Sequence, residues 1–169
     1  MDNLLRTDVG DAFGFTATEM GRICSDFGHP EKIGETMEWY GGYLFGDAEV
    51  CNPWNIANYL RGEFRTDMYW VQTGDTSLLR YALSYDASGR RDDIGTLGSH
   101  GMIVAELDLS EADAYAMDGG EPWPLMVMTG YLRAERHGDG FRLSIPNREL
   151  YTASRTSYWN RWIRTSASY

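Results

Sequence analysis

Phosphate binding is the first chemistry to test in this chain, because the sequence contains a single lysine. Lys32 lies in the segment His29-Pro30-Glu31-Lys32-Ile33. A nucleotide-binding P-loop needs a glycine-rich turn, then lysine and a hydroxyl residue, so that N–H groups, the ammonium and a bound magnesium ion converge on phosphates. Here Pro30 removes a donor, Glu31 repels an anion and Ile33 has no hydroxyl. The sequence therefore predicts no P-loop.

Other reactive side chains also lack a catalytic pattern. Cys24 and Cys51 have no histidine at ligand spacing, which favours two buried thiols over a zinc site. The three histidines lie far apart, each beside glycine or proline, and are expected in exposed loops. Acidic residues gather between positions 106 and 121 without the spacing of a calcium loop, so a solvated face is expected. We therefore expect no catalytic residue, no cofactor and no metal ion.

A hairpin predicted late in the chain carries Arg133, Arg136 and Arg142, which could contact nucleic-acid phosphates. Glu135 and Asp139 lie on the same hairpin, and the net charge of −10 disfavours tight duplex binding by the whole chain. DNA binding is therefore kept only as an alternative.

Four aromatic residues form a second group with two interpretations: Trp39, Tyr40, Tyr43 and Phe45. They could be a stacking platform for a base. Core packing is favoured, because Gly41 and Gly42 let two elements approach closely. Likewise, Asn52-Pro53-Trp54 could mark a ligand loop, but an N-cap followed by proline at the first helical position explains it without a ligand.

Composition limits the class of protein. With 169 residues and 43% apolar content, the chain is long enough for one domain or two small packed units. It has neither the apolar core of a signal peptide at its start nor a run of about 18 apolar residues anywhere. A cytoplasmic protein without a membrane association is expected.

Helix signals come first along the chain. Thr16 and Glu19 are spaced as a capping box, and Gly28 can end that helix in left-handed geometry. A second helix is predicted from residue 30 to 40. A third begins after Asn52, with Trp54, Ala57 and Leu60 directed inward, and a fourth is capped by Asp75 or Thr76.

The second half has a different pattern. Residues 86–101 are polar and glycine-rich and are expected to be a flexible connection. A strand over 102–109, a short helix over 122–129, a hairpin over 131–145 and a last helix after Asn147 are predicted to follow. The expected fold class is α+β, mainly helical: a helical subdomain at 1–85 and a winged-helix-like unit with a β-hairpin at 102–169.

Several short motifs occur in an order that resembles a known family, the AAA-ATPase-like proteins of bacteria and archaea. They are Phe13-Gly14-Phe15-Thr16, Trp39-Tyr40-Gly41-Gly42-Tyr43-Leu44-Phe45-Gly46, Cys51-Asn52-Pro53-Trp54, Tyr69-Trp70-Val71-Gln72-Thr73, Thr129-Gly130-Tyr131-Leu132, and Ile145-Pro146-Asn147 with Glu149. Such proteins typically carry an N-terminal P-loop ATPase domain, a helical and winged-helix-like segment, and a C-terminal nuclease-like domain of the PD-(D/E)XK type. The resemblance covers only the middle segment and implies structural roles for the motif residues.

Departures from the family pattern shape the expected function. Gly41 stands where the family tends to have an acid, and Leu44 stands where an arginine could reach phosphates. Lys32 also fails as a nuclease lysine, because Pro30 occupies the position of the required acid. The resemblance thus implies a noncatalytic segment, or a remnant of a split gene, that binds a protein partner: an ATPase domain or another copy of itself. A contribution to ATP hydrolysis in trans is the alternative from the same resemblance.

Overall fold

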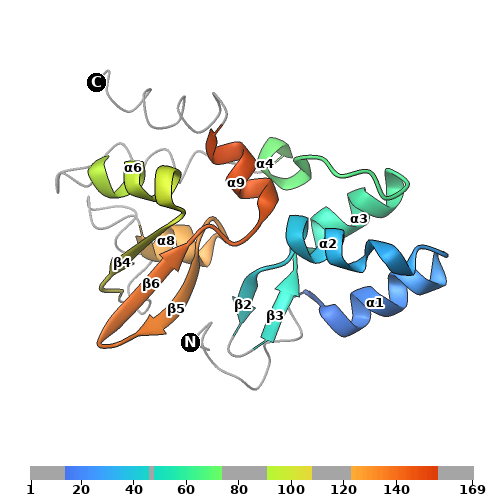
Figure 1. Ribbon diagram of the computed structural model, residues 1–169, viewed down its shortest axis with the longest axis horizontal. Coiled ribbons are helices and arrows are strands. Elements are labelled where there is room, and N and C mark those ends of the chain that lie inside the picture. The colour runs from blue at the N-terminus through green and yellow to red at the C-terminus, as the bar shows by residue number, and fades with distance from the viewer. Residues whose placement is uncertain (1–13, 46–47, 74–90, 108–122, 156–169) are drawn as a thin grey trace. The chain divides into compact units, whose positions relative to one another are not determined.

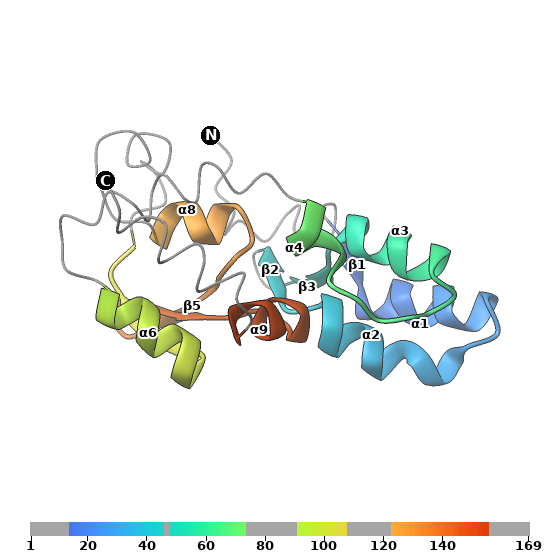
Figure 2. The same cartoon turned by 90° about the horizontal axis from the view of Figure 1, so that it is seen from above.

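The structure is a computed structural model, and it describes residues 14–45, 48–73, 91–107 and 123–155. Its fold class is α+β, as predicted, with helices and two antiparallel three-stranded sheets in the described ranges. The chain folds as two compact units (Figures 1 and 2). The first comprises Met1–Thr73 and Pro146–Glu149, and the second comprises Gly74–Ile145 and Leu150–Tyr169.

The first unit contains a small sheet that the sequence analysis did not predict. Its strands are β1 (Phe15–Thr16), β2 (Tyr43–Phe45) and β3 (Ala48–Cys51), in the order β1-β3-β2. Both pairings are antiparallel, with Cys51 opposite Phe15 and Val50 opposite Tyr43. Strands of two to four residues are too short to show the alternation by which a strand is recognised in sequence.

Helix α1 (Ala17–Asp26) begins and ends as predicted. The Glu19 carboxylate accepts the Thr16 N–H at 2.8 Å, and the Thr16 hydroxyl accepts the Glu19 N–H at 3.3 Å. At the other end Gly28 has a φ of +80°, and the N–H groups of Gly28 and His29 close the last turn. The capping box and the glycine therefore fix both ends of this helix locally.

The next two helices also begin where expected. A 3₁₀ turn, η2 (Pro30–Lys32), leads into α2 (Ile33–Tyr40), and α3 (Pro53–Arg61) has Asn52 as its N-cap. The predicted inward face of α3 is wrong at Trp54 and Ala57, however, which are exposed. Leu60 is half-buried and packs against the core, as predicted. The residues that α3 buries are Asn55, Ile56 and Tyr59.

The helices of the first unit enclose an aromatic core against the sheet. Its buried members are Met20, Cys24, Tyr40, Cys51, Ile56, Tyr59 and Phe64. Burying one such large apolar side chain contributes about 1.5–3 kcal/mol. Cys24 and Cys51 are both free thiols in this core, as the sequence predicted. The short helix α4 (Tyr69–Thr73) ends the described part of this unit before residues 146–149 return to it.

The described elements of the second unit are α6 (Arg91–His100), β4 (Met102–Ala105), α8 (Trp123–Met128), β5 (Arg133–His137), β6 (Gly140–Ser144) and the residues of α9 (Arg148–Arg155) from Leu150 onward. From β4 onward, they follow the predicted order of strand, helix, hairpin and helix. The strands β5 and β6 form the predicted hairpin, and β4 pairs with β6, so that the sheet order is β4-β6-β5. Phe141 and Leu143 of β6 are buried, as their alternation indicated.

Residues 91–100 correct one expectation. They form a helix, α6, and not part of a flexible connection. Gly95 and Gly98 inside this segment lowered its apparent helix propensity. The buried side chain of Leu97 gives the helix a packing contact that outweighs that propensity.

Some predictions lie outside the described residues. These are the helix capped by Asp75 or Thr76, the part of the flexible connection at 86–90, most of the acidic run, the last residues of the strand expected over 102–109, and the last helix beyond residue 155. Within the ranges that are described, no helix is both long enough and apolar enough to cross a bilayer.

Candidate functional site

Gly42 marks the place where early and late motifs meet in the first unit. Its backbone is left-handed, with a φ of +84°. A Cβ atom added to it would overlap the carbonyl oxygen of Pro146. Next to this contact, Asn147 donates a hydrogen bond from Nδ2 to the Gly41 carbonyl oxygen at 3.0 Å. Only glycine fits at position 42, which allows Pro146 and Asn147 to lie against the turn between α2 and β2.

Arg148 extends the same contact along α2. Its guanidinium lies 3.0 Å from the Glu38 carboxylate and 5.3 Å from the ring centroid of Trp39. The charged side chains of this ion pair are about half exposed, so the pair adds little stability. Trp39 is half-buried beneath the guanidinium. The Trp39 ring is therefore partly covered by the chain's own arginine.

Glu149 is fully buried in the first unit, and the sequence analysis did not select it as a site residue. One carboxylate oxygen accepts the Asn55 side-chain N–H at 2.5 Å. The other accepts the backbone N–H groups of Trp70 and Val71 at 2.7 and 3.3 Å. Glu149 thus caps the first turn of α4 while it binds α3. The sequence contained one signal for this residue: Glu149 follows Asn147 closely in one of the motifs on which the family resemblance rests.

Burial sets the electrostatics of Glu149. Loss of water around the carboxylate raises its pKa, and the hydrogen bonds from Val71, Trp70 and Asn55 oppose that rise. Donors on both oxygens hold the carboxylate in place, so the group is suited to joining three segments and not to proton transfer with a ligand. We interpret this cluster as structural.

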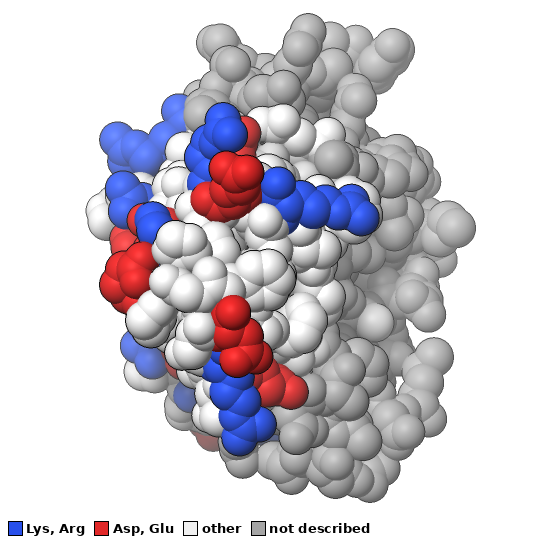
Figure 3. Space-filling view, turned by 90° about the vertical axis from the view of Figure 1, so that its right-hand side faces the viewer, with Lys and Arg blue, Asp and Glu red and all other residues white. Residues whose placement is uncertain are grey.

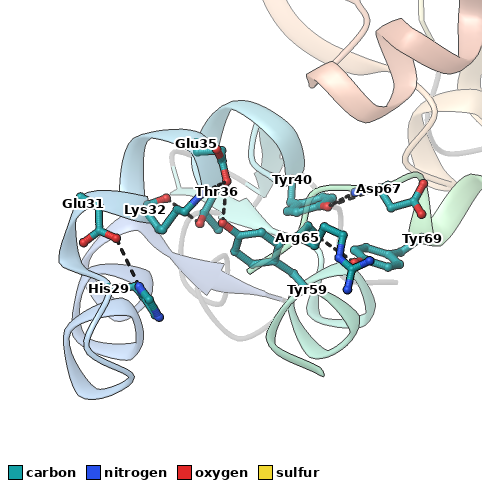
Figure 4. Close-up of polar contacts among 10 residues, drawn as sticks. All are labelled: His29, Glu31, Lys32, Glu35, Thr36, Tyr40, Tyr59, Arg65, Asp67 and Tyr69. Carbon is teal, nitrogen blue, oxygen red and sulfur yellow. Dashed lines mark hydrogen bonds and ion pairs between the residues drawn. The ribbon is translucent and has the colours of Figure 1, made fainter. Parts of the chain in front are cut away.

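Tyr40 and Tyr59 form the centre of the aromatic core (Figure 4). The Tyr40 hydroxyl donates to the Asp67 carbonyl at 3.1 Å and accepts the Asp67 N–H at 3.0 Å. Its ring meets that of Tyr59 edge-on, with centroids 5.3 Å apart. Tyr40 and Tyr43 are buried and Phe45 is half-buried. Tyr40 and Tyr43 are therefore not available as a stacking surface in the folded unit.

Lys32 is held in a local ion pair (Figure 4). Its ammonium lies 2.9 Å from Oε1 of Glu35, and the same oxygen accepts the Tyr59 hydroxyl at 3.0 Å. The hydrogen bond from Lys32 is the main reason that the pKa of Glu35 is lowered. The single lysine of the chain is thus paired with a carboxylate three residues further along the chain.

Trp54 is the motif residue whose side chain no packing role explains. Its N–H donates to the Asn52 side chain at 2.9 Å, and its carbonyl accepts from Asn58 at 2.8 Å. These contacts use the backbone only, and together with Pro53 they account for the start of α3. The indole itself is 49% exposed. An exposed tryptophan on a rigid helix is typical of an interaction surface.

A second exposed aromatic group lies where α1 and α3 end. Phe27 is 59% exposed, and its ring packs edge-on against Phe64, with centroids 6.0 Å apart. His29 lies against the same ring at 4.7 Å. Figure 3 faces this end of the first unit and shows an uncharged area between separate acidic and basic groups. This end therefore exposes apolar surface without a concentration of one charge.

The hairpin arginines lie in the second unit and are partly neutralised. Glu135 lies 2.7 Å from Arg133 and 3.3 Å from Arg142, which stands directly opposite it on β6. Arg136 instead lies over the ring of Phe141, 5.1 Å from its centroid. Hydrogen bonding to Arg133 is the main cause of the lowered pKa of Glu135, so this acid is ionised at neutral pH. Two of the three candidate phosphate contacts therefore share one carboxylate.

The last motif of the second unit forms a helix end. Gly130 has a φ of +79°, and its N–H donates to the Val127 carbonyl at 3.1 Å. The N–H of Tyr131 reaches back to the Met126 carbonyl at 2.8 Å. This pair of bonds is a Schellman motif at the end of α8, and the Tyr131 side chain is buried. Gly46 lies outside the described residues.

The structure thus gathers Trp39, Tyr40, Gly42, Tyr43, Pro146 and Asn147 in one part of the first unit. Among the described residues, no group of three or more His, Cys, Asp or Glu side chains is arranged to hold a metal ion. Comparison of the chain with models of protein families, with curated proteins and with solved structures finds no match.

Proposed function

We propose that this chain is a noncatalytic segment that acts by binding another protein, with Trp54 at the centre of the contact. The observation that supports the proposal is the 49% exposure of an indole on the first turn of α3. Tryptophan buries more area on binding than any other side chain and loses little conformational entropy. The start of α3 explains Asn52 and Pro53 in the Asn52-Pro53-Trp54 motif, but it does not explain the tryptophan side chain.

The resemblance to AAA-ATPase-like proteins supplies the class of partner, a P-loop ATPase domain. Such a domain would cover Trp54 and leave ATP hydrolysis to its own phosphate loop. Two other motif residues of the first unit, Tyr40 and Glu149, are buried, which supports packing and not chemistry. Lys32, which lies outside the motifs, is paired with Glu35. Binding of duplex DNA by the hairpin is disfavoured, because Glu135 offsets part of the positive charge of Arg133 and Arg142.

The test uses the full chain and the partner that the proposal requires, a P-loop ATPase domain encoded by an adjacent reading frame. Binding is measured by calorimetry, and the mass of the complex by light scattering. We expect Trp54→Ala to weaken binding by about thirtyfold, as loss of a central tryptophan costs roughly 2 kcal/mol. Its melting temperature should stay near that of the wild type, because Trp54 is 49% exposed and is not part of the buried core.

Tyr151→Ala is the matched control, since Tyr151 is an aromatic residue with 41% exposure on the other unit. It should bind the ATPase domain as the wild type does. A folded wild-type chain that does not bind the ATPase domain would overturn the proposal, as would full binding by Trp54→Ala. ATP turnover by the mixture, compared with the domain alone, tests the alternative of a contribution in trans.

A further inference from the structure

Strand β4 has one free edge in the described sheet. The order β4-β6-β5 places β6 on one side of β4, and no other described strand lies on its other side. Its sequence is Met102-Ile103-Val104-Ala105, without charge or proline. Proteins usually protect such edges with lysine, proline or a bulge, because unpaired N–H and C=O groups recruit another strand. The residues of β4 supply none of these protections.

Hydrogen bonding shows which backbone groups face this edge. The carbonyl of Gly101 accepts the Ile145 N–H at 3.2 Å, so it is directed toward β6. Across a trans peptide the N–H of Met102 is directed the opposite way. Because the direction alternates along a strand, the N–H and C=O groups of Met102 and Val104 face the free edge, and those of Ile103 face β6. Within the part of the chain that the structure describes, two residues therefore offer four unpaired groups to a new strand.

The same two residues expose their side chains. Met102 and Val104 lie on one face of the sheet and are 41% and 63% exposed. Ile103, on the opposite face, is buried and stands beside Leu143. An apolar edge is thus combined with an apolar outer face at the same two positions.

We propose that two copies of this chain pair through β4, antiparallel and about a two-fold axis perpendicular to the sheet at Ile103. This register places Met102 of each copy opposite Val104 of the other. All four edge groups of each copy are then used in four hydrogen bonds, and the two exposed side chains cover one another. The result is a continuous six-stranded sheet with an isologous interface.

Flanking residues are compatible with this register. Continued by one step, it brings Gly101 toward Ala105, which are both small. The other register that uses edge-facing groups is centred on Val104, and it would place Met102 beside the Glu106 carboxylate. The first register is favoured because apolar side chains contact apolar side chains.

This inference goes beyond the proposed function, since it concerns a different surface on the other unit. Loss of self-association with intact Trp54-dependent binding would remove this inference alone. Loss of ATPase-domain binding with intact self-association would remove only the proposed function.

Light scattering of the full chain over about a hundredfold range of concentration tests the pairing by mass action. We expect the mass of the wild type to rise toward that of a dimer. Val104→Lys should raise the dissociation constant by about tenfold or more, because each dimer would bury two ammonium groups at the edge. Met128→Lys is the control, because Met128 is 42% exposed but lies on α8. The dissociation constant of the Met128→Lys dimer should equal that of the wild type. A wild type that stays monomeric, or Val104→Lys that associates like the wild type, would overturn the proposal.

A cross-linking experiment tests the register. In the double variant Met102→Cys with Val104→Cys, each new thiol faces its counterpart at a Cα distance of about 5.5 Å, within disulfide range. Mild oxidation should give reducible dimers. Val104→Cys alone should give no such dimers. In the proposed register, position 104 of one copy lies opposite Met102 of the other copy and not opposite position 104. Dimers from the single variant, or none from the double variant, would show that the register is wrong.

Discussion

Asn55 donates its side-chain N–H to the Glu149 carboxylate at 2.5 Å, across 94 residues of chain. The bond joins α3 to the segment that returns to the first unit, and the same carboxylate caps α4. A buried acid with donors on both oxygens is costly to disturb, because either partner left alone is a buried polar group without its bond.

Glu149→Gln should destabilise the chain by about 2–3 kcal/mol in urea unfolding at pH 7. The new amide N–H₂ would face either the Asn55 side-chain N–H₂ or the backbone N–H groups of Trp70 and Val71, which are donors as well. The pH dependence has a definite sign. Burial raises the folded-state pKa of Glu149 above 4.5, so the folded state binds this proton more tightly than the unfolded state does. The wild type should therefore gain stability relative to Glu149→Gln as the pH falls from neutral toward 4.5.

Glu106→Gln serves as the control for the loss of one negative charge, because Glu106 is exposed. A stability difference between wild type and Glu149→Gln that shrinks as the pH falls would contradict the environment assigned to Glu149.

Gly42→Ala should cost about 3 kcal/mol or more, since it combines a left-handed backbone with overlap of the Pro146 carbonyl. Gly34→Ala is its matched control. Gly34 lies within α2 and a Cβ atom there has no neighbour within 4 Å. That substitution should stabilise the chain by about 0.5–1 kcal/mol. Thermal unfolding of both variants measures the contrast, and equal melting temperatures would refute the close approach.

Glu63→Gly should stabilise the chain by about 0.5–1 kcal/mol, despite the greater flexibility of glycine when unfolded. Glu63 has a φ of +54°, and its N–H and that of Phe64 form the paired bonds of a Schellman motif after α3. Glycine adopts this conformation without strain, whereas glutamate does not. Glu63→Ala controls for loss of the carboxylate and should give no such gain. A lower melting temperature for Glu63→Gly would argue against the left-handed geometry.

Glu135→Gln should increase the affinity of the chain for duplex DNA a few-fold at low salt, and should steepen its salt dependence. The reason is that the substitution frees Arg133 and Arg142 from their shared ion pair. In the wild-type background, Arg133→Ala with Arg142→Ala should change DNA binding little. Fluorescence anisotropy with a labelled duplex measures both. Tight, salt-sensitive binding by the wild type that the double substitution abolishes would instead establish the hairpin as a DNA contact.

Cys24 and Cys51 should not react with a thiol reagent at pH 8 until the chain is unfolded. Both are fully buried, and burial raises the pKa of each thiol, that of Cys51 to about 12. Absorbance assays with an aromatic disulfide should count two thiols in denaturant and close to none in buffer. Rapid reaction of either thiol in the native chain would place it outside the core.

Local signals in the sequence were sufficient for much of the fold. Thr16, Glu19 and Gly28 bound α1, and Asn52 with Pro53 begins α3, because a cap is a contact between residues only a few positions apart. The hairpin followed from alternation along β6. By contrast, the buried face of α3 was assigned to Trp54 and its neighbours, because a polar Asn55 gives no apolar signal.

The sequence by itself therefore determined both ends of α1, the start of α3, the hairpin, the α+β class and the lack of a phosphate loop around Lys32. Only the tertiary structure decided that Asn55 and Glu149 are partners, that Pro146 covers Gly42, and that Trp54 is exposed. It also decided that two arginines of the hairpin, Arg133 and Arg142, share the single carboxylate of Glu135. The physical reason is range: caps and alternation are read from neighbours in sequence, whereas burial and ion pairing depend on residues that folding brings together from distant positions or adjacent strands.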